Sequence, residues 1–270
     1  MNSCKLSQIN IYPLKSGAPT ELASSRIVKR GLEFDRHWAL FDDNMKVITG
    51  RSQTSLMKVS SELIDDYVMF SSPGMESIQV PIQELDSGHV DLKIFSSPGN
   101  GALVGRQVDE WFAEVAQQKC RLLFMDSLSE RKVIADNGGR KGDVVSYADQ
   151  SPILLTSTSS LDYLNALVGN DDAVMQQFRP NFVVEGIPAF QEDEWKFVSI
   201  GDCQFEVNQV CVRCVFTTVD VNTYQRNPNQ EPLKSLAAYR KSKGQDVSFG
   251  IHLIPRKLGI VNSGDLVSFR

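Results

Sequence analysis

Short apolar runs separated by turn residues are the feature that most constrains how this chain can fold. Four of them lie at residues 66–72, 77–82, 89–97 and 101–105. Residues 38–51 predict a hairpin, because two apolar runs there flank the turn sequence Asp-Asp-Asn. Ser-Pro-Gly, a typical turn sequence, occurs twice in this part of the chain. Many short strands with such turns predict a β-barrel or a β-sandwich.

Helical spacing of apolar residues appears at fewer places. Residues 108–119 carry apolar side chains at every third or fourth position, which predicts a helix. A second helix, at 159–169, is predicted to be capped by Ser159 or Ser160 and to stop at a glycine. A third, at 232–244, has proline at its start and glycine at its end. The predicted fold class is therefore mainly β with a few helices (α+β).

The chain length, together with the change from strand-like to helical spacing of the apolar residues, predicts two domains. The chain has 270 residues, enough for one large domain or two modest ones. The first predicted helix interrupts the run of strands, so the boundary is placed just after it. The prediction is two β-rich domains, over residues 1–120 and 121–270.

The charge and the composition disfavour several classes of protein. The net charge is −5, whereas general nucleic-acid binders usually carry a basic surplus. No apolar run approaches the roughly 18–20 residues of a transmembrane helix, and the N-terminus lacks the apolar core of a signal peptide. Five irregularly spaced cysteines do not form a disulfide framework. We therefore expect no nucleic-acid partner, no membrane and a cytoplasmic location.

Two of the cysteines, Cys211 and Cys214, lie close together in the sequence VCVRCVFTTVD. A zinc knuckle or a dithiol site needs both sulfurs on one side of a turn. The β-branched flanks instead predict a strand, in which residues three apart point to opposite faces. Only three histidines exist, and none has knuckle spacing to this pair. Shared chelation is disfavoured, and the alternative for either cysteine alone is a buried small hydrophobic residue.

Several polar residues stand beside glycine, proline or strand ends. Such cations could converge on an anion such as a phosphate, or each could be a solvated charge or a structural ion pair. A carboxylate just before a strand could accept hydrogen bonds from the amino groups of a heterocycle, or it could simply be a turn residue. Neither GxGxxG nor GxxxxGK[ST] occurs, which argues against a Rossmann or P-loop nucleotide site. The residues concerned are Lys15, Arg36, Asp149, Ser151, Arg179 and Arg213.

The order of the segments resembles a known family. YPLKSG, GLEFDRHW, ITGR, VSYADQSPILL, FRPNFVVEG, VRCVFTTVD, PLKSLAAYR and FGIH follow one another along the chain. In this order, nearly end to end, the sequence is similar to the MOSC-domain proteins. It most resembles the branch with an N-terminal MOSC β-barrel domain, which includes the mitochondrial amidoxime-reducing component and its bacterial relatives. The resemblance implies an N-terminal MOSC β-barrel domain followed by a MOSC β-barrel.

The resemblance also implies a cofactor and its site. The cofactor is the molybdenum cofactor (Mo-molybdopterin), a pterin dithiolene that bears a phosphate. Its protein ligand falls on Cys214 as the catalytic and metal-binding residue, and not on Cys211, and a thiolate is a soft ligand suited to such a centre. Pyridoxal phosphate binding is left open as a further expectation. Cofactor contacts fall on Lys15, Ser16, Arg36, Asp149, Ser151, Arg179, Asn181, Val212, Arg213 and His252.

This sequence departs from the family pattern in three respects. Val221 and Tyr224 stand where the family has a proline and a glycine, so the loop after Asp220 is expected to be reshaped. His252 stands where relatives have a tyrosine, and because it lies in an apolar run it could instead be a core histidine. Some bacterial relatives carry a C-terminal ferredoxin domain, whose cysteines this sequence lacks, so electrons are expected from a separate flavin or iron–sulfur protein.

The implied function is a molybdenum-cofactor oxidoreductase. Its substrates would be small N-hydroxylated compounds such as amidoximes, hydroxylamines and N-hydroxylated bases. Asp220 is a candidate proton donor only through its nearness to Cys214 in the sequence. Two alternatives remain open: a carrier of the cofactor or of its sulfur, and a binding module without turnover.

Overall fold

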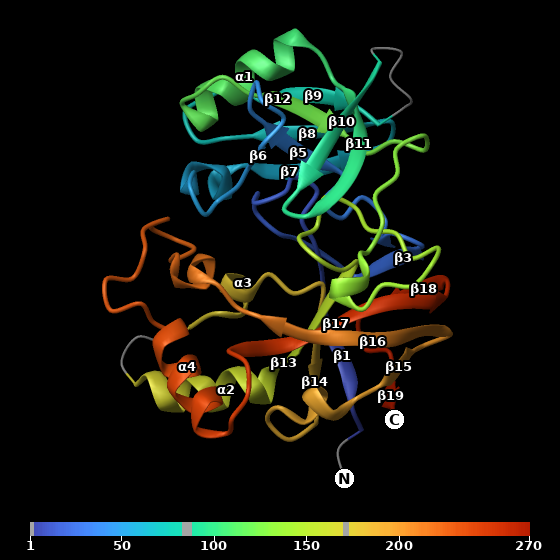
Figure 1. Ribbon diagram of the computed structural model, residues 1–270, viewed down its shortest axis with the longest axis vertical. Helices are drawn as coiled ribbons and strands as arrows, with labels where there is room; N and C mark the ends of the chain where they lie inside the picture. The colour runs from blue at the N-terminus through green and yellow to red at the C-terminus, as the bar shows by residue number, and fades with distance from the viewer. Residues whose placement is uncertain (1–2, 83–87, 170–172) are drawn as a thin grey trace. The chain divides into compact units, whose positions relative to one another are not determined.

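The chain forms two compact units in the computed structural model (Figure 1). The structure describes residues 3–82, 88–169 and 173–270. The first unit comprises residues 1–10, 21–33 and 151–270. The second comprises residues 11–20 and 34–150. Each unit is thus assembled from separate stretches of the chain, and the single boundary after residue 120 stays a prediction about the domains.

An eight-stranded sheet is the main element of the first unit. Its strand order is β19-β15-β16-β17-β13-β14-β1-β2. The bridge between Lys5 and Leu266 joins β1 to the start of β19, so the sheet curls round as in a barrel. The strands are β1 (Lys5–Ile11), β2 (Thr20–Leu22), β13 (Ile153–Ser157), β14 (Phe182–Glu185), β15 (Phe197–Ile200), β16 (Cys203–Val212), β17 (Ser248–Lys257) and β19 (Val267–Phe269).

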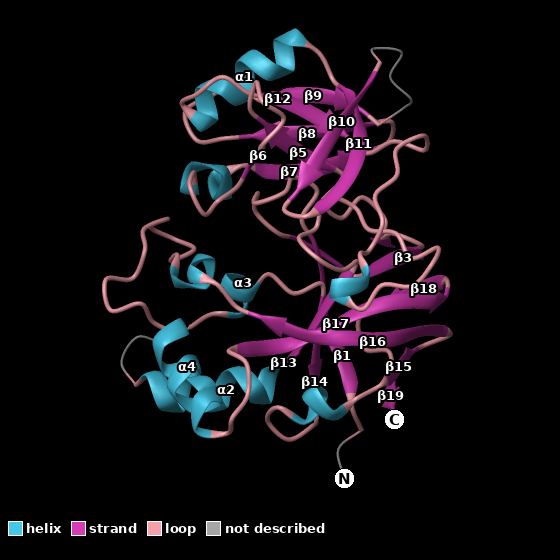
Figure 2. Cartoon of the chain, viewed as in Figure 1, coloured by secondary structure: helices cyan, strands magenta, loops and turns pink. Residues whose placement is uncertain are grey.

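A smaller sheet and several helices complete the first unit. The sheet has the order β18-β3-β4, with β3 (Ser24–Val28), β4 (Gly31–Leu32) and β18 (Gly259–Asn262). Helices α2 and α4 pack against each other (Figure 2). The α-helices here are α2 (Thr158–Val168), α3 (Met175–Phe178) and α4 (Leu233–Ser242). The 3₁₀ helices are η3 (Gln191–Glu194) and η4 (Val215–Thr218).

The ends of these helices follow the expected chemistry with one correction. Helix α2 stops at Gly169, as predicted, but its cap is Ser157 and not Ser159 or Ser160. The Ser157 hydroxyl accepts the backbone N–H of Ser160 at 3.1 Å, which satisfies one of the donors that the first turn leaves open. The predicted α4, which starts after a proline and ends before a glycine, is confirmed. The one-turn helix α3 has no periodic signal and was not predicted.

Two sheets form the second unit. Their orders are β10-β11-β12-β5-β6 and β7-β8-β9. The predicted hairpin is confirmed as β5 and β6, with the Asp42 N–H donating to the Lys46 carbonyl at 3.0 Å. The strands are β5 (Trp38–Phe41), β6 (Val47–Ile48), β7 (Ser60–Ile64), β8 (Tyr67–Ser71), β9 (Ile78–Pro81), β10 (His89–Ile94), β11 (Ser97–Leu103) and β12 (Arg121–Phe124). The helices are α1 (Arg106–Ala116), η1 (Thr54–Lys58) and η2 (Ala135–Asn137).

The core of the second unit explains why α1 forms. Val108, Phe112 and Val115 lie on one face of this helix and are buried. They join a core around Trp38, which stacks on Phe124 with ring centroids 4.8 Å apart. The fold class predicted from the sequence, mainly β with a few helices, is confirmed. Among the described residues, no helix is both long enough and apolar enough to span a membrane.

Candidate functional site

Cys214 lies on a tight turn directly after a strand of the first unit. Strand β16 ends at Val212, and η4 begins at Val215 with Cys214 as its capping residue. The backbone N–H and the hydroxyl of Thr217 both donate to the Cys214 carbonyl, at 3.1 and 3.0 Å. The Thr218 hydroxyl donates to the Val215 carbonyl at 2.7 Å. The predicted continuation of the strand through TTVD is therefore wrong, because two threonines satisfy the carbonyls three residues back.

The five cysteines differ in accessibility. All lie in the described part of the chain, and none of them forms a disulfide. Only Cys214 is not buried, whereas Cys211 is 7% exposed. Burial raises the pKa of Cys4 to about 11, that of Cys120 to about 12, and that of Cys203 above its usual value. Cys214 is therefore the cysteine of the five that a group from solvent reaches most easily, and its role as a metal ligand stays a prediction.

The neighbouring Arg213 directs its side chain into the protein. Its Nε and Nη2 donate to the Phe249 carbonyl at 2.9 and 2.5 Å, and its Nη1 donates to the Phe178 carbonyl at 2.9 Å. Its guanidinium also lies 5.4 Å from the centre of the Phe178 ring. Arg213 therefore ties the Cys214 turn to α3 and β17, and its contact with a cofactor stays a prediction.

The FRPN segment lies beside this turn. Arg179 caps α3 with a left-handed backbone (φ 55°), and its guanidinium lies 5.7 Å from the centre of the Phe216 ring, on η4. Asn181 is fully buried, and its side chain bonds two main-chain groups. Its Nδ2 donates to the Asn10 carbonyl at 3.0 Å, and its Oδ1 accepts from the Leu154 N–H at 3.1 Å. Asn181 therefore supports the strands on either side of it.

The remaining predicted residues of the first unit lie on its main sheet or at its margin. The Ser151 hydroxyl accepts from the Asn208 amide at 2.7 Å. His252 is buried on β17, with its Nδ1 3.2 Å from the Gln209 amide nitrogen. Val212 is 53% exposed. Their contacts with a cofactor stay predictions.

A cluster of ionised side chains lies in the second unit. Lys15 forms an ion pair with Asp149 and donates to the Tyr147 carbonyl at 2.8 Å. Arg51 binds the other oxygen of Asp149 at 2.6 Å, and its guanidinium lies 5.0 Å from the centre of the Phe95 ring. One carboxylate thus bridges two cations. Arg51 belongs to the ITGR segment that carried the family resemblance, but it had no predicted role.

The pKa values in this cluster follow from burial and charge. Burial lowers the pKa of Lys15 to about 8, although the charge of Asp149 opposes the shift. Burial would raise the pKa of Asp149, but Lys15 and Arg51 outweigh it and hold this pKa well below its ordinary value. At neutral pH both groups are therefore ionised.

Arg131 holds the segment that presents Asp149. Its side chain is almost fully buried. It donates to the carbonyls of Ser146 and Ala148, both at 2.5 Å, and to that of Asp149 at 2.9 Å. Burial lowers the pKa of Arg131 to about 10, so it stays charged at neutral pH. Together with Lys15, Arg131 contributes to an excess of cations around one carboxylate, which suits an anionic group.

Two further predicted residues of the second unit, Ser16 and Arg36, have their own hydrogen-bond partners within that unit. Ser16 has a left-handed backbone (φ 69°), and its hydroxyl accepts the Gly50 N–H at 2.9 Å. Arg36 binds both oxygens of the buried Asp35, at 2.8 and 2.6 Å, and its guanidinium lies 4.2 Å from the centre of the Tyr12 ring. The charge of Arg36 is thus balanced by its neighbour, and its contact with a cofactor stays a prediction.

Asp220 accepts hydrogen bonds from the turn that follows it. Its Oδ1 accepts the N–H of Asn222 at 2.9 Å, and the N–H and the hydroxyl of Thr223 at 2.6 and 3.0 Å. The hydrogen bonds from Thr223, with that from Asn222, hold the pKa of Asp220 below its usual value. The carboxylate therefore caps the turn that follows, and its role as a proton donor stays a prediction.

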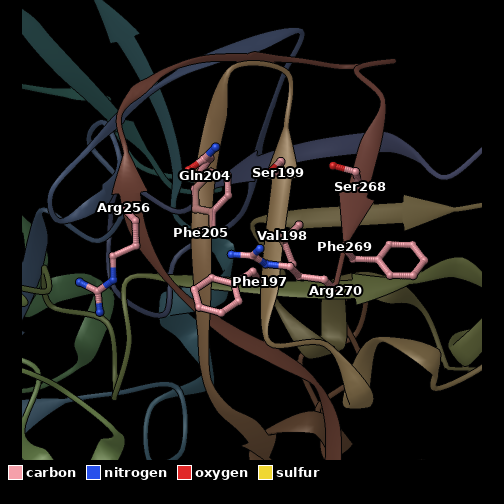
Figure 3. Close-up of a pocket in the computed structure, with 9 residues that line it drawn as sticks. All are labelled: Phe197, Val198, Ser199, Gln204, Phe205, Arg256, Ser268, Phe269 and Arg270. Atoms are coloured by element: carbon pink, nitrogen blue, oxygen red, sulfur yellow. The ribbon is translucent and has the colours of Figure 1, made fainter.

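A pocket on the main sheet of the first unit lies apart from these residues. Its volume is about 340 Å³. Figure 3 shows the Arg270 guanidinium beside Phe197, and its distance to the centre of that ring is 4.7 Å. None of the predicted site residues lines the pocket. It is lined by Phe197, Val198, Ser199, Gln204, Phe205, Arg256, Ser268, Phe269 and Arg270.

Comparisons with known proteins define the class of this chain. Residues 3–119 match the MOSC N-terminal beta barrel domain, and residues 142–268 match the MOSC domain. The chain is 31% identical to mitochondrial amidoxime-reducing component 1 of Danio rerio, covering 97% of this chain and 83% of that protein. It is 33% identical to mitochondrial amidoxime reducing component 2 of Rattus norvegicus, covering 97% and 82%. Molybdenum cofactor sulfurase of Danio rerio is 28% identical over 93% of this chain and 32% of that protein.

The chain therefore belongs to the family of MOSC-domain proteins with an N-terminal MOSC β-barrel domain, the family of the mitochondrial amidoxime-reducing components.

Proposed function

We propose that this chain is a molybdenum-cofactor oxidoreductase that reduces small N-hydroxylated compounds. The observation that carries the proposal is the Cys214 turn, which holds the one cysteine of the five that is not buried. Two similar proteins are named amidoxime-reducing components, and these names support the substrate class. Electrons would come from a separate flavin or iron–sulfur protein.

The residues present fit such a cofactor in two respects. Cys214 offers a soft sulfur ligand whose capped turn fixes its backbone. Lys15, Arg51 and Arg131 surround the single carboxylate of Asp149, so an anion such as a phosphate would meet an excess of positive charge. When bound, the cofactor would supply the two-electron chemistry that removes the hydroxyl oxygen from nitrogen.

The chain's own residues would bind and orient the cofactor. In the first unit, Cys214 would hold the metal as a thiolate. In the second unit, Lys15 and Arg51 are donors already fixed by Asp149, and they would be able to bind an anion such as a phosphate. Arg179 would add a further cation beside the Cys214 turn. The other residues predicted from the family match would complete the binding site through main-chain and side-chain contacts.

Metal analysis of two variants tests the site. Protein from a host that makes the cofactor should contain molybdenum in the wild type and in Cys211→Ser, and should lose it in Cys214→Ser. The opposite pattern would refute the assignment. The same preparations should reduce benzamidoxime with an artificial electron donor, and failure to turn over with molybdenum bound would refute the enzymatic proposal.

A second candidate function is that of a carrier of the cofactor or of its sulfur. The similarity to molybdenum cofactor sulfurase favours it. Cys214 would then be a transient ligand or a persulfide. Transfer of the cofactor from the loaded chain to an apo-acceptor enzyme, without reduction of benzamidoxime, would support this candidate over the reductase.

A further inference from the structure

One side chain joins helix α3 to the far end of the Cys214 turn. Gln177 lies on α3, and its Nε2 donates to the Thr217 carbonyl at 3.1 Å and to the Val219 carbonyl at 3.5 Å. Its Oε1 accepts the N–H of Val174 at 2.9 Å. The amide therefore uses its nitrogen to reach η4 and its oxygen to cap its own helix.

The same short helix also meets the near end of the turn. The Phe178 carbonyl accepts from Nη1 of Arg213, the residue before Cys214, at 2.9 Å. Thr217 and Val219 follow Cys214, and their carbonyls lie at the C-terminal end of η4, where a helix lacks partners of its own. Successive residues of α3 thus hold the chain on both sides of Cys214.

We propose that Gln177 is a positioning residue that fixes the conformation of η4 and, through it, the direction of the Cys214 thiol. Its consequence for metal binding rests on the proposed role of Cys214 as the ligand. A short 3₁₀ turn has poorer hydrogen-bond geometry than an α-helix, so an external donor at its carbonyls contributes much of its rigidity. The thiol lies at the cap of that turn and moves with it.

An alternative reading is that Gln177 only caps α3. Gln177→Glu separates the two roles, because it keeps an acceptor for the Val174 N–H and replaces the donor that faces the Thr217 and Val219 carbonyls by a carboxylate. Gln176→Glu is the matched control, since it makes the same chemical change at the preceding, exposed position of the same helix. Gln177→Met removes the donor without adding charge.

The first readout is the alkylation rate of each cysteine in cofactor-free protein, measured by mass spectrometry with iodoacetamide. In Gln177→Glu and Gln177→Met, Cys214 should react about tenfold faster than in the wild type, as expected for the loss of a hydrogen bond that leaves acceptors unsatisfied. The buried Cys203 and Cys211 of the same unit serve as internal references and should not change. Gln176→Glu should behave as the wild type.

The second readout is the molybdenum content of protein loaded in a competent host. It should fall in both Gln177 variants and stay at the wild-type level in Gln176→Glu. Equal alkylation of Cys214 in Gln177→Met and wild type would overturn the proposal, as would an equal rise at every cysteine, which would indicate general loosening. If the Cys214 rate rises but Cys214→Ser retains molybdenum, the positioning role stands and the proposed function fails.

Discussion

Replacing Asp149 with asparagine should destabilise the second unit, because it removes the one carboxylate that bridges Lys15 and Arg51. Lys15 is 5% exposed and would keep a buried charge with only neutral acceptors, the Tyr147 carbonyl and the amide oxygen of the new asparagine. Removing one partner of a buried pair costs about 3–5 kcal/mol. Because the Asp149 side chain is 38% exposed, solvent screens part of this loss, and a decrease of about 2 kcal/mol in the free energy of unfolding is expected.

Tryptophan fluorescence during urea unfolding can isolate this unit. The chain has three tryptophans, of which Trp38 and Trp111 lie in the second unit and Trp195 in the first. In a Trp195→Phe background the signal reports on the second unit alone. Asp136→Asn, an exposed change in the same unit, is the control and should shift the free energy by less than about 0.5 kcal/mol. A loss in Asp149→Asn no larger than in this control would refute the reasoning.

Three other changes have defined outcomes. Folding lowers the pKa of Lys15 to about 8 from 10.5, so the folded state binds fewer protons than the unfolded state between these values. The second unit should therefore gain stability as pH rises from 8 to 10. Urea unfolding of Lys15→Met should show no such gain, and an equal gain in this variant would contradict the lowered pKa of Lys15. Arg240→Met should lower the free energy of unfolding of the first unit by about 3 kcal/mol, since it removes the buried cation that pairs with the partly buried Asp193 at 2.5 Å. Calorimetry that shows no change would contradict this. Gly250→Ala should lower the Tm by several degrees, because φ is +77° and the added Cβ would lie 2.4 Å from the Leu155 carbonyl; an unchanged Tm would disprove the strain.

The parts of the fold that could be predicted are those with a local signal. The hairpin at 38–51 and the helix at 108–119 follow from the spacing of their apolar residues, and both are confirmed. The prediction that the strand continues beyond Val212 is wrong, although the residues there have high β propensity. There the hydroxyls of Thr217 and Thr218 bond carbonyls three residues back, and this local competition replaces the sheet.

The site was harder to predict, because its organising contacts are distant in sequence. Arg51 and Asp149 are 98 positions apart, and Gln177 and Thr217 are 40 apart. Arg131 acts on main-chain carbonyls, which every residue has, so its partners leave no pattern in the sequence. The family resemblance supplied residue positions but not the partners that decide what each side chain does.

Those partners divide the cations into two groups with different expected consequences. Arg131 and Arg213 each donate hydrogen bonds to main-chain carbonyls of their own unit. The loss of Arg131 should therefore first change the conformation of Asp149, and the loss of Arg213 that of the Cys214 turn. Lys15 and Arg51 share one carboxylate, so they can offer further donors to an anion without leaving a buried acceptor unsatisfied. Lys15 and Arg213, which the family resemblance treats alike, therefore have different kinds of hydrogen-bond acceptor, and we expect their loss to have different consequences.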